Sequence, residues 1–226
     1  MGINVVQTGA FTTLDGIHAE RLHDVIEALD LARAGHGSSW TALIEGDGPL
    51  RSRLSHQGLS TPSDRASIQW DDPTLLFVML SATNEDGSPY PLAGELSRER
   101  FGRYPTESGS ALEYLLEHLS IPAEDPRRRR PPATELPSLL KQLHEGLTSA
   151  SCGHTTWERG NGGLTIRGFL DAKDVGTVLE QLQRQAWGAN ADEPLDGGVQ
   201  DVVRHLTAHL KEARKRKLGV LCRAHA

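Results

Sequence analysis

The amino-acid sequence predicts an α+β protein in which a mostly antiparallel sheet is covered by amphipathic helices. Three observations lead to this prediction. Short segments rich in β-branched and apolar residues recur along the chain, segments with apolar residues at steps of three and four lie between them, and turn residues separate the two kinds. We expect two lobes, residues 1–121 and 134–226, joined by a linker at 122–133, and a sheet shared by both lobes is compatible with this pattern.

The first part of the chain predicts a strand, a helix and a second strand. Residues 3–8 are β-branched and alternate weakly, which favours a strand. Apolar residues recur at helical spacing between 22 and 32, and Gly35 and Gly37 provide the end of this helix. Residues 40–45 alternate imperfectly and predict the second strand.

A hairpin is predicted next, because apolar, β-branched and aromatic residues at 66–70 and 74–82 flank the turn residues Asp71, Asp72 and Pro73. The stretch 75–80 is apolar at every position. We therefore expect it to be a central strand covered by helices on both faces.

The rest of the N-terminal lobe has a polar turn at 84–89, an irregular stretch at 90–105 and a helix that begins after Ser108 or Ser110. The proline-rich stretch that follows contains four arginines, 127–130, and cannot bury apolar surface, so it predicts the linker. The arginines could also hold phosphate or nucleic acid, but they lack interleaved aromatic residues for base stacking, which favours the linker.

The C-terminal lobe gives the clearest pattern. Asp171 is expected to cap the N-terminus of a helix, with Asp174 adding negative charge to its first turn. The predicted elements are a helix from 136 to 147, a glycine-rich loop at 152–163 around Trp157, a strand at 164–170, a helix after Asp171, a loop at 188–198, a helix at 199–213 and a strand at 218–222.

Composition limits the function. The net charge is -6 and the calculated pI about 5.9, which argues against nucleic acid as the partner. No apolar run approaches the roughly 20 residues that span a bilayer, and the N-terminus lacks the features of a secretory signal, so we expect a cytoplasmic protein. Two cysteines do not form a disulfide framework.

Two loop groups are candidates for binding a partner protein. Trp157, Glu158 and Arg159 lie in the predicted glycine-rich loop, and Trp and Arg are favoured interface anchors. Alternatively, Trp157 folds back over the adjacent helices. Asp71 and Asp72 could form an acidic rim together with the acids of the 84–89 turn, although aspartate is also common in turns for local reasons.

A histidine pair is the candidate metal site. His205 and His209 stand four residues apart on the predicted final helix, so both rings could bind zinc. Leu206 stands where a zinc protease has its glutamate, so that general base is missing. Further possible ligands are Cys152, His154, Cys222 and His225. The alternative is that both histidines lie beside the buried stripe of an ordinary basic helix.

No phosphate-binding loop, nucleophile elbow or CxxC pair is present, so the sequence assigns no catalytic residue and no cofactor apart from the zinc alternative. The segment 168–175 with its helix, and the long final helix ending in 217–221, resemble the end of the YfbM-like family of bacterial proteins of unknown function. The similarity extends over 134–226. It implies a role as an immunity partner in a bacterial toxin system.

The leading hypothesis is thus a non-catalytic, cytoplasmic bacterial interaction protein, such as an immunity or accessory factor that binds another protein through an acidic and aromatic surface. One alternative is a metal-dependent hydrolase that uses His205 and His209. Another is a protein that sequesters a small molecule. A homo-oligomer is compatible with the sequence.

Overall fold

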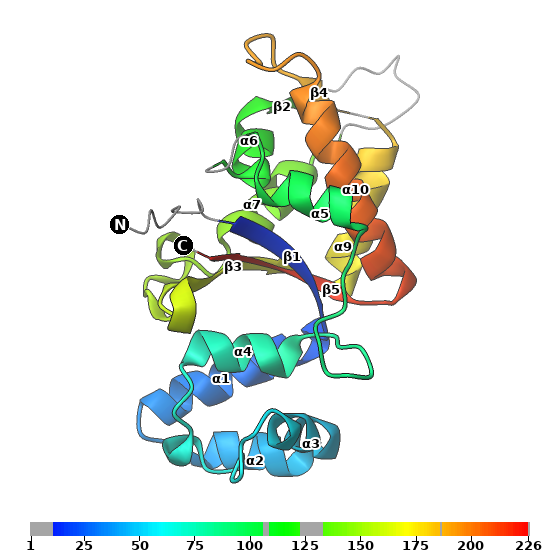
Figure 1. Cartoon of the computed structure of the whole chain (residues 1–226). Helices are drawn as coiled ribbons and strands as arrows, with labels where there is room; N and C mark the ends of the chain where they lie inside the picture. The colour runs from blue at the N-terminus through cyan, green and yellow to red at the C-terminus, as the bar shows by residue number, and fades with distance from the viewer. Residues whose placement is uncertain (1–10, 106–108, 123–132, 186, 226) are drawn as a thin grey trace, which may run out of the picture.

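The computed structural model describes residues 11–105, 109–122, 133–185 and 187–225, and has helices on both sides of a central antiparallel sheet (Figure 1). The strand order is β1, β5, β3, with β1 Phe11–Ile17, β5 Gly219–His225 and β3 Leu164–Leu170. Two short strands, β2 Leu119–Ser120 and β4 Gly188–Ala189, pair separately. The prediction of an α+β fold with an antiparallel sheet is confirmed.

The helices of residues 19–80 lie on one side of the sheet, with the helix at 72–80 against it and those at 38–46 and 48–56 farthest from it (Figure 1). Their core contains Trp40, Leu75 and Trp157, all fully buried or nearly so. The elements of this layer are the short 3-10 helix η1 Ala19–Arg21, α1 Leu22–Arg33, α2 Ser38–Gly46, α3 Gly48–His56, the 3-10 helix η2 Arg65–Ser67 and α4 Asp72–Leu80.

The other side of the sheet carries a second group of helices (Figure 1). Their core contains Leu115, Leu179 and Leu206. These helices are α5 Glu95–Gly102, α6 Ala111–His118, α7 Leu136–Glu145, α9 Ala172–Gln183 and α10 Gly198–Lys215. The connection before β3 holds α8 Ser149–Cys152 and two 3-10 turns, η3 Thr156–Glu158 and η4 Asn161–Gly163.

The helices with clear start signals form where the sequence predicts them. Asp171 caps α9, accepting a hydrogen bond from the Asp174 N–H at 2.7 Å, and Ser110 caps α6 in the same way through the Glu113 N–H. Gly35 follows α1 with a φ of 90°, a left-handed conformation that suits glycine at a helix end. The strand at 164–170 and the final helix and strand are also confirmed.

The predicted hairpin is wrong. Residues 72–80 form helix α4, while 65–67 form a 3-10 turn. Asp71 is the N-cap of α4, accepting from the Thr74 N–H at 2.9 Å, and Pro73 lies in the first turn, where no backbone donor is needed. An apolar run of this length fits a fully buried helix as well as a buried strand, so its periodicity does not decide between them.

Two further expectations are corrected. Residues 40–45 lie in helix α2, where Trp40 and Ile44 are four residues apart and both fully buried. Helix α5 occupies part of the stretch expected to be irregular. The predicted strand at 3–8 and residues 123–132 of the predicted linker lie outside the described residues.

Both predicted lobes contribute to the same sheet, because β1 of the first pairs with β5 of the second. They also contribute to both cores: α5 and α6 pack with α7, α9 and α10, while Leu147, Trp157 and Leu164 pack with α1 to α4. Within the described parts of the chain, none of the helices combines the length and apolar character needed to cross a bilayer.

Candidate functional site

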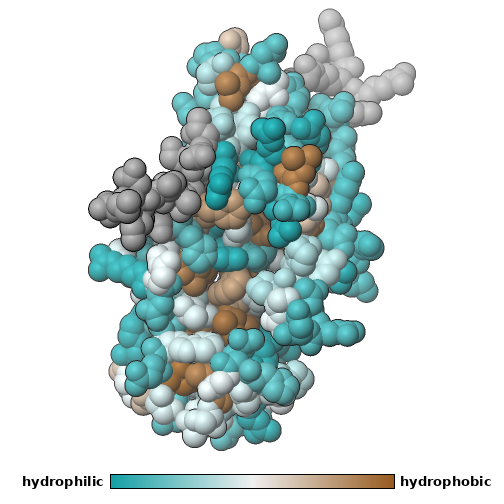
Figure 2. All heavy atoms as spheres, in the orientation of Figure 1, coloured by the Kyte–Doolittle hydropathy of each residue, from teal (hydrophilic) through white to brown (hydrophobic). Residues whose placement is uncertain are grey.

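A cleft of about 400 Å³ with polar side chains in its lining lies beside β1. We call it the β1 cleft. It is bounded by β1, residues 89–91 and α5, with His209 from α10 and Arg223 from β5 in its lining. Figure 2 shows that hydrophobic residues are visible in the middle of this side of the molecule, within a largely hydrophilic surface.

The cleft exists because β1 is an edge strand of the sheet. The chain after α4 runs along this edge, with Ile17 pairing with Ser81 and Asp15 with Pro91. At the other end, Gly102 brings α5 close to β1: a Cβ at this position would stand 2.8 Å from the carbonyl oxygen of Thr12. The edge is therefore covered at both ends, with the cleft along it.

An ion pair lies in this cleft. The Nε of Arg223 donates to Oδ2 of Asp15 at 2.6 Å, and the hydroxyl of Thr13 donates to the same oxygen at 3.0 Å. The Arg223 guanidinium also lies 4.5 Å from the centre of the Phe77 ring. A buried ion pair such as Asp15–Arg223 contributes little net stability to a fold. Stability alone therefore does not explain this pair, and its position in a cleft makes both residues candidates for binding a ligand.

His209 contributes a hydrogen-bond acceptor to the cleft. Its Nδ1 lies 2.8 Å from the carbonyl oxygen of His205, which can only accept, so Nδ1 carries a proton. In the neutral ring, Nε2 is then the acceptor. Burial lowers the pKa of His209 below its ordinary value of 6.5, so the ring is neutral near pH 7.

The two predicted metal ligands have different surroundings. His205 Nδ1 lies 3.1 Å from the Ser97 hydroxyl and its Nε2 lies 3.6 Å from Oδ1 of Asp201, whereas His209 lies in the β1 cleft. Burial lowers the pKa of His205 as well. Across residues 11–105, 109–122, 133–185 and 187–225, no group of three or more His, Cys, Asp or Glu side chains is arranged to hold a metal ion.

The other proposed metal ligands lie elsewhere. Cys152 and His154 neighbour each other, with Sγ and Nδ1 3.9 Å apart, and Cys152 packs against the core of α1 to α4. Burial raises the pKa of the Cys222 thiol to about 12, which disfavours the thiolate that binds metals. His225 is engaged by the Arg223 guanidinium. A zinc site at His205 and His209 stays a prediction.

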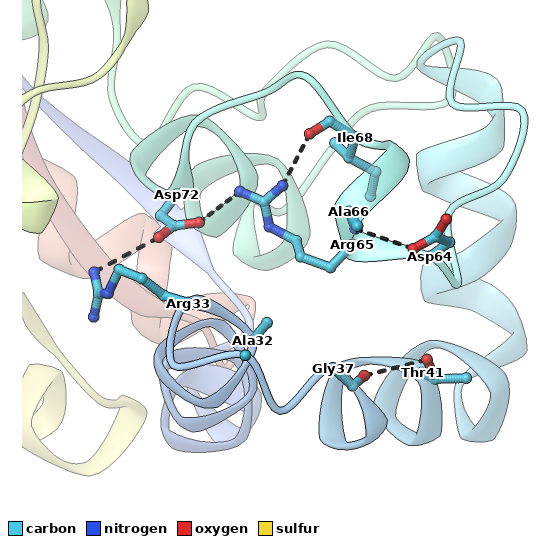
Figure 3. A pocket seen from close by; sticks show the side chains of 10 residues that line it. Ala32, Arg33, Gly37, Thr41, Asp64, Arg65, Ala66, Ile68 and Asp72 are labelled. Atoms are coloured by element: carbon cyan, nitrogen blue, oxygen red, sulfur yellow. Dashed lines mark hydrogen bonds and ion pairs between the residues drawn. The ribbon is translucent and has the colours of Figure 1, made fainter.

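The predicted partner-binding residues come together at the N-terminus of α4. The Asn161 N–H donates to Oδ2 of Asp71 at 2.8 Å, which joins the loop before β3 to the start of α4. Asp72 lies between Arg65, at 2.7 Å, and Arg33, at 3.7 Å (Figure 3). We call the surface formed by Arg33, Asp71, Asp72, Glu158 and Arg159 the α4 surface.

The acids of the α4 surface are engaged in local structure. Asp71 caps α4, Asp72 is paired with two arginines, and Glu158 accepts from the Ser149 N–H at 2.6 Å. Trp157 is 1% exposed and folds back into the core beside α4, which is the alternative given for it above, and partner binding by this loop stays a prediction. The exposed members are Arg33 and Arg159.

A shallow hollow of about 460 Å³ adjoins the α4 surface (Figure 3). Arg33, Arg65, Asp72 and Thr41 are among its lining residues. The Arg65 side chain is held by the carbonyl oxygens of Ile68 and Trp70 as well as by Asp72, which leaves Arg33 as its more exposed cation.

Sequence reasoning found His209 but missed Asp15 and Arg223. The sequence predicts the first strand at 3–8 and so does not place Asp15 in a strand. The available signal was an aspartate in the β-branched segment 11–17 and an arginine in the last strand, which face each other only once the pairing of β1 with β5 is known.

No family model, curated protein or solved structure matches the chain.

Proposed function

We propose that this chain is a binding protein that holds a small molecule in the β1 cleft. The supporting observation is that Asp15 from β1, His209 from α10 and Arg223 from β5 line one cleft together with apolar and aromatic side chains. Small-molecule sites usually combine such walls with a few placed polar groups. This is the sequestering function that the sequence left as an alternative.

The polar groups are held in place before any ligand arrives. Arg223 and Thr13 fix the Asp15 carboxylate, and the His205 carbonyl fixes the tautomer of His209. Because these side chains have little freedom left to lose, a ligand that matches them binds at low entropic cost.

Ligand screening by thermal shift tests this proposal. A ligand at about one hundred times its Kd adds about 2.7 kcal/mol to the free energy of unfolding, which raises the Tm of a chain of this size by roughly 5–10 °C. Glu99→Trp places a bulky ring at the cleft and should abolish the shift, while Glu27→Trp on the exposed side of α1 should retain it. A library that gives no shift, or a shift that persists in Glu99→Trp, contradicts the proposal.

A second candidate function is binding of another protein at the α4 surface, as a bacterial, cytoplasmic immunity or accessory factor. It is favoured by one observation: two loops about ninety residues apart in sequence are fastened together by the Asp71–Asn161 hydrogen bond, next to exposed Arg33 and Arg159. The exposed cations match a partner that presents carboxylates.

Pull-down from the native host at micromolar concentration tests this second function. A specific partner should be lost with Arg33→Glu and Arg159→Glu together and retained with Arg51→Glu, an exposed arginine on α3. Retention of the partner by the double variant would place its binding elsewhere.

A further inference from the structure

We infer that the β1 cleft binds an organic cation, an ammonium or guanidinium group on an apolar body, whose N–H groups are accepted by Nε2 of His209 and by the carboxylates of Glu95 and Glu99. This inference rests on the proposed function and gives its ligand a chemical class.

The acceptor character of the cleft begins with His209. His209 is 1% exposed and lines the cleft, and the hydrogen bond of its ring runs from Nδ1 to the His205 carbonyl, which leaves Nε2 available on the other side of the ring. Because Nδ1 is already donating to the His205 carbonyl, the neutral ring can offer only a lone pair to a ligand. A ligand that donates a hydrogen bond satisfies this nitrogen, whereas a carboxylate does not.

The charged side chains that line the cleft also favour a cationic ligand. Asp15 and Arg223 neutralise each other. Of the remaining charged residues that line the cleft, Glu95 and Glu99 are carboxylates and Arg98 is the cation, and none of the three forms an ion pair with any described residue. The two unpaired carboxylates stand one helical turn apart on α5, on the same side of the helix.

The walls suit an apolar body attached to the cation. Phe101 is buried, lines the cleft and lies with its ring 5.3 Å from that of His209, and Leu14 and Pro91 add apolar surface. Two other aromatic residues of the lining already attract guanidinium groups, since Arg103 lies over Phe11 and Arg216 over Tyr90. A cation with a short hydrocarbon chain matches both parts of the cleft.

Three probes of the same length and different charge test the inference: n-butylammonium, butyrate and 1-butanol, titrated by calorimetry at matched ionic strength. The n-butylammonium ion should bind, and the double variant Glu95→Gln/Glu99→Gln should weaken its binding about tenfold, as expected for the loss of two exposed charges. The matched control Glu20→Gln/Glu27→Gln, on the opposite layer, should bind like the wild type. Both carboxylates of the test variant are exposed, so the fold should tolerate it.

His209→Gln gives an independent reading, since it should reduce the affinity for n-butylammonium while the far-UV spectrum confirms folding. The cation can belong to a free amine or to a lysine side chain of another protein. N-acetyl-lysine amide distinguishes these sources: if it binds at least as tightly as n-butylammonium, the ligand is a protein side chain, and if it is excluded, the ligand is a free amine.

Two outcomes overturn the inference and are distinguishable. If butyrate or another anion binds and Glu99→Trp blocks it, the cation class is wrong while the proposed function stands. If no compound of any charge binds the cleft, both the inference and the proposed function fail.

Discussion

At the scale of single residues, His209 makes the stability of the protein depend on pH. Its pKa is lowered chiefly by burial, and the nearby charges of Asp15 and Arg98 act in opposite directions. Because the folded state resists protonation of this ring, the unfolded chain binds more protons as pH falls through about 6.5, and the free energy of unfolding must decrease. The stabilisation is present above that pH and is lost as the pH approaches the lowered pKa.

We therefore expect urea unfolding to show a smaller free energy of unfolding at about pH 5.5 than at about pH 8. His209→Gln should reduce this difference, because glutamine does not titrate. His36→Gln, at an exposed position after α1, serves as the control and should leave the difference unchanged. An equal pH dependence in His209→Gln and wild type would show that His209 is not the group responsible.

Gly168 is a second residue with a defined role, because it allows β3 and α7 to approach closely. A Cβ at this position would stand 2.0 Å from the carbonyl oxygen of Gln142 and 2.7 Å from that of Leu143. Both contacts are with backbone atoms, which cannot move without shifting α7. The glycine is needed here for space.

Gly168→Ala should therefore lower the free energy of unfolding by about 1–3 kcal/mol or more, as other overpacked sites do. Gly176→Ala is the matched control: no atom lies within 4 Å of its added Cβ, and alanine in a helix interior should stabilise by about 0.5–1 kcal/mol. Both are measured by urea denaturation. A neutral Gly168→Ala would mean that β3 and α7 separate easily.

At the scale of elements, Asp71 both starts α4 and holds the neighbouring loop. One carboxylate oxygen accepts from the Thr74 N–H as the N-cap, and the other accepts from the Asn161 N–H. The two roles can be separated, since asparagine keeps one acceptor oxygen but replaces the other with a donor.

Asp71→Ala should cost about 1 kcal/mol for the cap and more for the lost loop contact, whereas Asp171→Ala removes only the cap of α9. Asp71→Asn should retain most of the cap and lose the contact to Asn161. Chemical denaturation gives the energies, and hydrogen exchange of the Asn161 amide reports the loop contact. If Asp71→Asn exchanges as slowly as wild type at this amide, the loop is held by other contacts.

The helices also show which local sequence signals are sufficient to predict an element. Helices α9 and α10 have an apolar stripe with polar residues elsewhere, and α9 also has a side-chain cap, so sequence alone predicted them. Helix α4 is apolar on all sides because it is buried between α1 and the sheet, and this burial removes the periodicity that distinguishes helix from strand. Asp71, the N-cap of α4, is a helix-start signal in the sequence, but an aspartate at this position also fits a turn.

At the scale of the whole molecule, the sheet connects the beginning and the end of the chain. Strand β5 is paired along its length with both β1 and β3, so the predicted lobes 1–121 and 134–226 complete each other's sheet. A fragment of residues 134–226 would leave one edge of β5 unpaired and would lose the contacts of α5 and α6 with α10.

We expect this fragment to lack a cooperative unfolding transition, while the full chain unfolds in a single one. Circular dichroism during a urea titration measures both. If the fragment fails to fold because the sheet is shared, mixing residues 134–226 with residues 1–121 should restore the cooperative transition. A fragment that unfolds cooperatively alone would show that the C-terminal lobe folds independently.

The alternative of a zinc site at His205 and His209 is tested by measuring the metal content of the intact protein. Metal analysis of protein purified without a histidine tag tests this alternative, because metal-free protein would contradict a zinc site at His205 and His209. Stoichiometric zinc that is lost in both His205→Ala and His209→Ala would instead support the metal-dependent hydrolase.

The sequence by itself determined the fold class and the elements whose signals are local: the side-chain cap at Asp171, a serine cap at 108 or 110, the turn glycine Gly35, and the stripes of α7, α9 and α10. These follow from hydrogen bonds and burial within a few residues of each other. Sequence also pointed to His209, although for metal binding.

Only the tertiary structure decided that α2 and α4 are helices, that Trp157 is buried, and that Asp15, His209 and Arg223 share a cleft. The reason is physical: burial and strand pairing depend on segments about two hundred residues apart, as in the Asp15–Arg223 ion pair, and no local pattern records which distant segment will be the neighbour.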